Sequence, residues 1–172
     1  MEEPTQVTVS KRSIGAMFGL YSGIASVVIF FVLHFLGNNP FGNARFIGTV
    51  VTIVLMVLAH KKFKDSGDGF MSFGEGFEIG FWMVLVSTTI STLIPYLYVT
   101  YVDYAPMTMF LDDQLFQMQE KGTPDETIEM AQTWTKKLFW VFAGIGGLIG
   151  GVVISLLVSI FTQKRSAASE FN

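Results

Sequence analysis

Two carboxylates, Glu75 and Glu78, are the residues whose types and spacing come closest to a chemical site. They lie three residues apart, so on a helix they share one face, and near a membrane boundary such a pair could admit a cation or a proton. A structural role competes with this one. Ser72 to Glu75 match the S-x-x-E capping box that opens a helix, and both carboxylates could pair with basic residues of the preceding loop, namely Lys61, Lys62 and Lys64. We favour capping and pairing, because both residues lie at the edge of an apolar run and not at its middle.

The other residues able to do chemistry are few and scattered along the chain. There is no Cys, and we place the two histidines, His34 and His60, on opposite sides of a membrane, where they cannot share a metal ion. No HExxH, P-loop or GxSxG motif occurs. An enzyme acting on lipids would have to use Asp103, Asp112 and Asp113, for which a solvated acidic face is the simpler interpretation. We therefore expect no enzyme, no catalytic residue, no metal site and no cofactor.

The composition indicates that a membrane positions these residues. Of 172 residues, 51% are hydrophobic and only 15% are charged, and the mean hydropathy is +0.50, whereas soluble domains average about 25% charged residues. A helix crosses a bilayer with roughly 20 mainly apolar residues, and four segments meet this need: about 14–36, 41–60, 74–101 and 138–161. The sequence thus predicts an all-α bundle of four transmembrane helices, forming a single membrane domain over residues 1–172.

Lysine and arginine residues of the short loops predict the orientation. Seven of them adjoin one side of the predicted membrane and four adjoin the other; the seven are Lys11, Arg12, Lys61, Lys62, Lys64, Lys164 and Arg165. Both termini and the 60–75 loop are therefore expected in the cytoplasm, and the 102–137 segment outside. The first apolar run is longer than the core of a signal peptide and no cleavage motif follows it. We expect an uncleaved first span in a bacterial inner membrane.

The outer segment, 102–137, has the pattern of a helical hairpin between the third and fourth spans. One apolar stripe recurs at helical spacing, comprising Met107, Phe110, Leu111, Leu115 and Met118. Gly122 then predicts a stop, and Thr123 and Pro124 predict a new helix with Thr123 as its N-cap and Pro124 as its first residue. That helix is predicted to continue unbroken into the fourth span. The stripes could cover each other, rest on the membrane surface or dock onto another protein.

Small residues at four-residue spacing predict close packing between the spans, since lipid gives helices no hydrophobic reason to associate. The predicted packing positions are Gly15, Gly19 and Gly23 on the first span, Gly76 and Gly80 on the third, and Gly147 and Gly151 on the fourth. They could serve a monomeric bundle, which we favour, or a homo-oligomer. Pro95 predicts a kink in the third span, as a gate or as the bend that closes the bundle.

Three segments carry a resemblance to a known family. Residues 70–81, FMSFGEGFEIGF, contain the SFG-x-x-F-x-x-GF pattern, and residues 117–129 and 147–161 add a Met- and Glu-rich loop and a Gly-rich last span. The chain resembles in these segments a bacterial membrane-protein family catalogued as a domain of unknown function. The resemblance implies a four-helix inner-membrane protein of about this length, and it implies no activity, substrate or site residue.

Two functional hypotheses follow. The first is a non-catalytic inner-membrane scaffold or accessory subunit of a membrane complex, based on the predicted packing faces and the outer hairpin. The alternative is a small transporter or flippase-like protein for an ion or a lipid-linked substrate, with Glu75, Glu78 and Pro95 as its working parts. Expected partners are membrane lipids and another membrane protein or a second copy of the chain. A net charge of −3 leaves no basic surface for nucleic acid.

Overall fold

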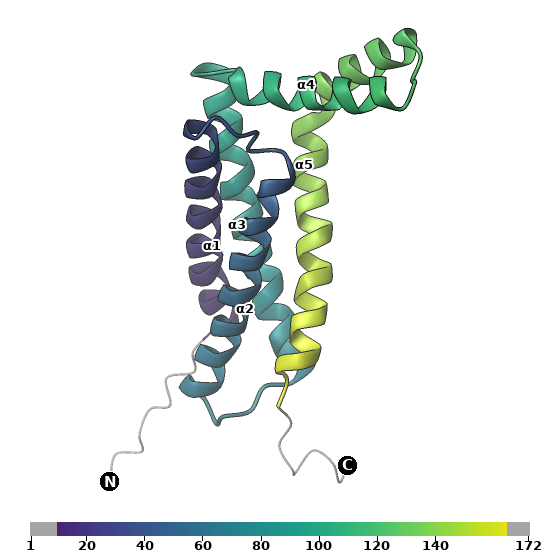
Figure 1. The fold of residues 1–172 in the computed structure, drawn as a ribbon. Coiled ribbons are helices and arrows are strands. Elements are labelled where there is room, and N and C mark those ends of the chain that lie inside the picture. Colours follow the sequence, from purple (N-terminus) through teal and green to yellow (C-terminus); the bar gives the residue numbers. More distant parts are fainter. Residues whose placement is uncertain (1–9, 165–172) are drawn as a thin grey trace, which may run out of the picture.

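The computed structural model describes residues 10–164, and nearly all of them are helical (Figure 1). In chain order the elements are α1 (Lys11–Phe35), the short 3-10 helix η1 (Asn43–Arg45), α2 (Phe46–Ser66), α3 (Phe73–Tyr101), α4 (Ala105–Glu120) and α5 (Asp125–Thr162). The only extended pairing within the described residues is an isolated bridge between Met71 and Lys164. The predicted all-α class is confirmed.

Four of these helices, α1, α2, α3 and α5, are long and apolar enough to cross a membrane, so the chain is a multi-pass membrane protein. The second span differs from its predicted bounds: α2 begins at Phe46 and not at residue 41, and it continues to Ser66. The reason lies in the preceding turn. The side-chain carbonyl of Asn39 accepts the backbone N–H of Phe41 at 2.9 Å, which holds the chain around Pro40 outside a helix.

The helix α3 is the centre of the bundle, with α1 on one side and α5 on the other. Figure 1 shows the ends of the described chain at one end of the bundle and α4 lying across the opposite end. We call the end of the bundle that holds the ends of the described chain the inner end, and the end crossed by α4 the outer end. The bundle has two buried apolar clusters, one toward the inner end around Ile79 and Met83 and one near the outer end around Phe30 and Val99.

Glycines bring α1 against α3 along a parallel contact. A Cβ atom at Gly15 would lie 2.5 Å from the carbonyl oxygen of Ile79, and one at Gly19 would lie 2.6 Å from that of Met83. At Gly23 the nearest atom is the Cβ of Ile90, at 2.8 Å. Because no side chain larger than hydrogen fits at these three positions, the two backbones approach closely enough for dispersion to hold them together.

Glycines also line the contact where α5 runs antiparallel to α3, on α3 in its inner half and on α5 farther out. Going up from the inner end, Gly76 faces Ser159, Gly80 faces Ser155, and Gly151 faces Val84. A Cβ at Gly80 or Gly151 would collide with the side chain opposite. At the next step Gly147 is looser, since its nearest neighbour is a methyl carbon of Thr88 at 3.1 Å.

The predicted outer hairpin is present as α4 and the first turns of α5, and we call residues 105–135 the outer arm. Figure 1 shows the arm extending sideways beyond the bundle, with the first turns of α5 beside α4. The helix then continues without interruption to Thr162, about 57 Å along its axis. The predicted start is wrong by one position: Pro124, with ψ of 143°, is the N-cap. Thr123 instead donates its backbone N–H to Met118, closing the end of α4.

Candidate functional site

The inner end of α3 carries the predicted capping box. The backbone N–H and the hydroxyl of Ser72 both donate to one carboxylate oxygen of Glu75, at 2.8 and 2.9 Å. The backbone N–H of Glu75 donates in return to the Ser72 hydroxyl at 3.3 Å. This closed arrangement satisfies two backbone groups that the first turn of a helix leaves unpaired, and it engages the Glu75 carboxylate in a structural contact.

Glu78 pairs with a residue that the sequence did not indicate. Its carboxylate lies 2.7 Å from the Nζ atom of Lys11, at the start of α1. The lysines proposed as partners, Lys61, Lys62 and Lys64, belong to α2, and the Nζ atom of Lys64 donates to the carbonyl oxygen of Thr162 instead. The correction follows from the parallel packing of α1 and α3, which brings their inner ends side by side.

His60 joins three helices at the inner end, a role the sequence analysis missed. Its side chain lies on α2 with 0% exposed surface. Nε2 is 2.9 Å from the carbonyl oxygen of Gly76 on α3, so it carries the proton and donates. Nδ1 is 2.7 Å from the hydroxyl of Thr162 on α5. The sequence signal was a lone histidine ending an apolar run, which does not show where the neighbouring helices place their polar groups.

A cleft of about 900 Å³ with the character of a binding site lies between α2 and α5. Its α3 wall runs from Val84 to Pro95, so it extends from the middle of the bundle to the outer end. Ser26 and Phe30 of α1 line its floor, and the glycine-rich face of α5 lines the side opposite α2. This volume falls in the range of about 300–1,000 Å³ that small-molecule sites occupy.

The polar lining of the cleft consists of neutral groups. Hydroxyl groups come from all of its transmembrane walls: Ser26, Thr49, Thr52, Ser87, Thr88, Ser91, Thr92 and Thr135. Gln114 adds an amide at the outer mouth, and no described residue of the lining is Asp, Glu, Lys, Arg or His. A charged substrate would therefore find no counter-charge inside the cleft.

Three of these hydroxyl groups differ from the rest because they have no partner. Those of Thr49, Thr88 and Thr92 make no hydrogen bond with any residue that the structure describes. Others are engaged: Ser22 bonds both Thr52 and Ser87, at 2.8 and 3.1 Å. Thr49 faces the cleft from α2, while Thr88 and Thr92 are one turn apart on α3. Free donors thus lie on two walls of the cleft.

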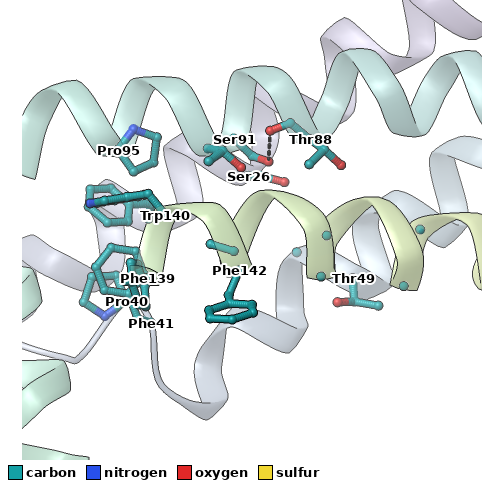
Figure 2. Close-up of a pocket in the computed structure, with 18 of the residues that line it drawn as sticks. Ser26, Pro40, Phe41, Thr49, Thr88, Ser91, Pro95, Phe139, Trp140 and Phe142 are labelled. Atoms are coloured by element: carbon teal, nitrogen blue, oxygen red, sulfur yellow. Dashed lines mark hydrogen bonds between the residues drawn. The ribbon is translucent and has the colours of Figure 1, made fainter. Parts of the chain in front are cut away.

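Aromatic side chains close the outer part of the cleft. Figure 2 shows Phe41, Phe139 and Trp140 gathered at one end, with Thr49 and Thr88 farther along. The ring centroids of Phe41 and Phe139 are 4.9 Å apart, and those of Phe139 and Trp140 are 5.0 Å apart. Pro95, singled out in the sequence as a kink, lines this same end from inside α3.

A family model described as "Protein of unknown function (DUF4199)" matches residues 17–164, which include every residue that lines the cleft. The chain belongs to this family. Membership in DUF4199 agrees with the resemblance seen in the sequence and adds no activity. No curated protein and no solved structure matches the chain.

The predicted site residues of this DUF4199 member thus fall into separate places. Ser72, Glu75 and Glu78 lie at the inner end, the glycines lie in the helix contacts, and Pro95 borders the cleft. The structure does not bring Pro95 and the two carboxylates together. A sequence signal for the cleft did exist, since residues 87–92 read Ser-Thr-Thr-Ile-Ser-Thr inside a predicted span, but it does not show which hydroxyl groups lack partners.

Proposed function

We propose that this protein is a non-catalytic membrane protein that serves as an accessory subunit or scaffold of a membrane complex. The observation that carries the proposal is the outer arm, which extends beyond the bundle and exposes large apolar side chains. Phe116 is 62% exposed and Met130 is 58% exposed. Such side chains outside the hydrocarbon layer are typical of contact surfaces.

The arm is internally packed, which makes it a defined surface and not a loose connection. Leu111 of α4 and Ile128 of α5 are buried, and the Gln132 side-chain amide and the Thr135 hydroxyl donate to Leu111 and Gln114 of α4. Hydrogen bonds of these side chains thus join the two helices of the arm, while Met107 and Leu111 of α4 pack with Phe30 and Val99 of the bundle. Phe116 and Met130 remain outside this contact and are available to a partner.

The charge around these exposed residues suggests a partner with basic residues at its rim. The arm carries the acidic residues Asp112, Asp113, Glu120, Asp125, Glu126 and Glu129, against the single basic residue Lys121. Complementary charges mainly set the orientation and rate of association, while the apolar residues supply affinity. The proposed partner is thus a membrane protein with an apolar patch bordered by Lys or Arg.

The cellular setting belongs to the same proposal. We place the protein in a bacterial inner membrane with both termini and the 60–75 loop in the cytoplasm, supported by the distribution of basic residues between the two sides. The arm then faces outward and would meet the external parts of neighbouring membrane proteins.

Site-specific photocrosslinking in the native membrane tests the accessory role. A photoreactive phenylalanine analogue at Phe116 is expected to give a discrete adduct with one other polypeptide, which also copurifies stoichiometrically in mild detergent. Phe161, 85% exposed at the inner end, is the matched control and should give lipid adducts alone. Phe116→Ser should abolish copurification without lowering the melting temperature. Adducts with lipid alone at position 116, or with a second copy of this chain, would refute an accessory role.

A second candidate, a flippase-like carrier of an uncharged lipid-linked molecule, is favoured by the cleft alone. Ion transport has no such support, since Glu75 caps α3 and Glu78 pairs with Lys11. In liposomes, a fluorescent neutral lipid should exchange between leaflets faster with the protein than without it, and Gly150→Leu should remove the difference. Equal exchange with and without protein would eliminate this candidate.

A further inference from the structure

We propose that the cleft between α2 and α5 binds one uncharged, chain-bearing lipid, whose carbonyl or ester oxygens accept hydrogen bonds from Thr49, Thr88 and Thr92. This inference does not rest on the proposed accessory role, because the three threonines that it invokes lie on α2 and α3 and not in the outer arm. It rests on three observations: unpartnered donors, a neutral lining and a volume that fits a lipid.

The unpartnered hydroxyl groups point to a ligand with acceptor atoms. A hydroxyl in a membrane helix ordinarily bonds the carbonyl oxygen four residues earlier, as Ser26, Thr52 and Thr89 do here at 2.8–2.9 Å. Thr49, Thr88 and Thr92 do not use this option, although they belong to the same helices. In hydrocarbon, no water is present to satisfy such groups, so an acceptor inside the cleft would satisfy them.

The neutral lining limits the chemistry of that ligand. A phosphate or carboxylate head group recruits Arg or Lys, and the described lining holds no ionisable side chain of any of the five common kinds. Lys137, which precedes Leu138 of the lining, has its Nζ atom 5.6 Å from the centre of the Trp134 ring. An uncharged head group whose oxygens accept hydrogen bonds costs far less free energy to bury in this environment than a charged one.

The dimensions favour a lipid over a transmembrane helix. A helix that crosses a bilayer is about 30 Å long and at least 10 Å wide, roughly 2,400 Å³, whereas the cleft holds about 900 Å³. Gly146 and Gly150 form one wall, and no atom lies within 4 Å of the position that a Cβ would take at either. The glycines thus leave a smooth surface along α5 on which an extended chain can lie, with the rings of Phe139 and Trp140 at its outer end.

The experiment uses the full-length protein in nanodiscs with diacylglycerol that bears a photoreactive diazirine on one chain. Labelled residues are mapped by mass spectrometry and are expected on the cleft-facing sides of α2 and α5. Phosphatidic acid with identical chains and the same diazirine is the charged comparison and should label those positions at least about tenfold less. Unlabelled diacylglycerol and an unlabelled isoprenoid quinone, both uncharged carbonyl compounds, are used as competitors, and the stronger competitor identifies the natural source.

Variants connect the labelling to the cleft. The triple change Thr49→Val, Thr88→Val and Thr92→Val keeps the side-chain shape and is expected to reduce labelling about tenfold or more, from three lost hydrogen bonds. Thr89→Val is the matched control, because Thr89 lies on α3 outside the cleft and bonds Leu85. Gly150→Leu should block labelling by filling the cleft, while Gly144→Leu, at a position outside the cleft lining with equally open space, should not.

Three outcomes would overturn the proposal. The first is equal labelling by the neutral and the charged probe, and the second is labelling spread evenly over all lipid-facing residues. The third is unchanged labelling in the triple threonine variant, whose melting temperature shows whether it is folded. Loss of the Phe116 crosslink affects only the accessory role, so the two proposals fail separately.

Discussion

Replacing Gly19 by alanine tests whether close backbone contact between α1 and α3 holds the bundle together. The added Cβ would lie 2.6 Å from the carbonyl oxygen of Met83 and 2.9 Å from the Cβ of Val86. Carbon atoms reach optimal separation at about 3.5–4.0 Å, so the helices must separate by roughly 0.6–1 Å. Neither obstacle is the end of a flexible side chain, so the strain cannot be relieved by a change of rotamer.

The expected magnitude combines two opposing effects. Overpacking of this kind costs about 1–3 kcal/mol, whereas Gly to Ala in a helix contributes up to about 1 kcal/mol of stability. The net loss for Gly19→Ala is about 1–2 kcal/mol, or a melting temperature lower by roughly 2–8 °C for a chain of this size. Gly147→Ala should lower the melting temperature by less than Gly19→Ala does, because the nearest obstacle to its Cβ, the methyl carbon of Thr88 at 3.1 Å, can move.

Thermal unfolding in one fixed detergent, followed by circular dichroism, measures these differences. Gly144→Ala is the matched control: it is also a membrane-helix glycine, yet nothing lies within 4 Å of its Cβ position. We expect the melting temperature to be highest for Gly144→Ala, lower for Gly147→Ala and lowest for Gly19→Ala. A Gly19→Ala protein as stable as Gly144→Ala would refute the reasoning that this contact excludes a methyl group.

Three further predictions concern the ends of the bundle. His60→Ala should lower the free energy of unfolding by about 1–3 kcal/mol, because the buried carbonyl oxygen of Gly76 and the half-buried hydroxyl of Thr162 each lose a hydrogen bond. Lys61→Ala, at an exposed neighbour, should change this free energy little, and equal effects would exclude a special role for His60. Ser72→Ala should cost about 0.5–2 kcal/mol through loss of the cap, seen as faster hydrogen exchange in the first turn of α3; unchanged exchange would contradict this. Since the chain has no Cys, Gln117→Cys should react with an impermeant maleimide on intact cells and Asp68→Cys should not; the reverse pattern would invert the proposed orientation.

The sequence was informative where a feature depends on neighbours along the chain. The four apolar spans, the capping box of Ser72 and Glu75, and the continuity of α5 all follow from local spacing, and the structure contains each of them. The glycine spacing also marked faces that pack closely. The glycine spacing did not predict which helix packs against each face, because a face of small residues fits equally against any other helix or a second copy of the chain.

The cleft and the pairing of Glu78 with Lys11 could not be predicted from the sequence, for a specific physical reason. In water, apolar residues mark the buried face of a helix, but in lipid both faces are apolar, so periodicity does not give the rotation of a helix about its axis. The pairing of Glu78 with Lys11, the position of His60 and the cleft lined by Thr49 and Thr88 all depend on those rotations. Each is therefore visible only when the helices are placed together.

The continuity of α5 has a consequence for communication between the two ends of this helix. Its first turns belong to the outer arm, and the mouth of the cleft is lined by Trp134 and Thr135 at the end of the arm and by Leu138 just after it. No loop separates the two, so a displacement of the arm also displaces the cleft mouth. Allosteric coupling of this kind is reciprocal: a lipid that alters the affinity of the arm for a partner must have its own affinity altered by that partner to the same degree.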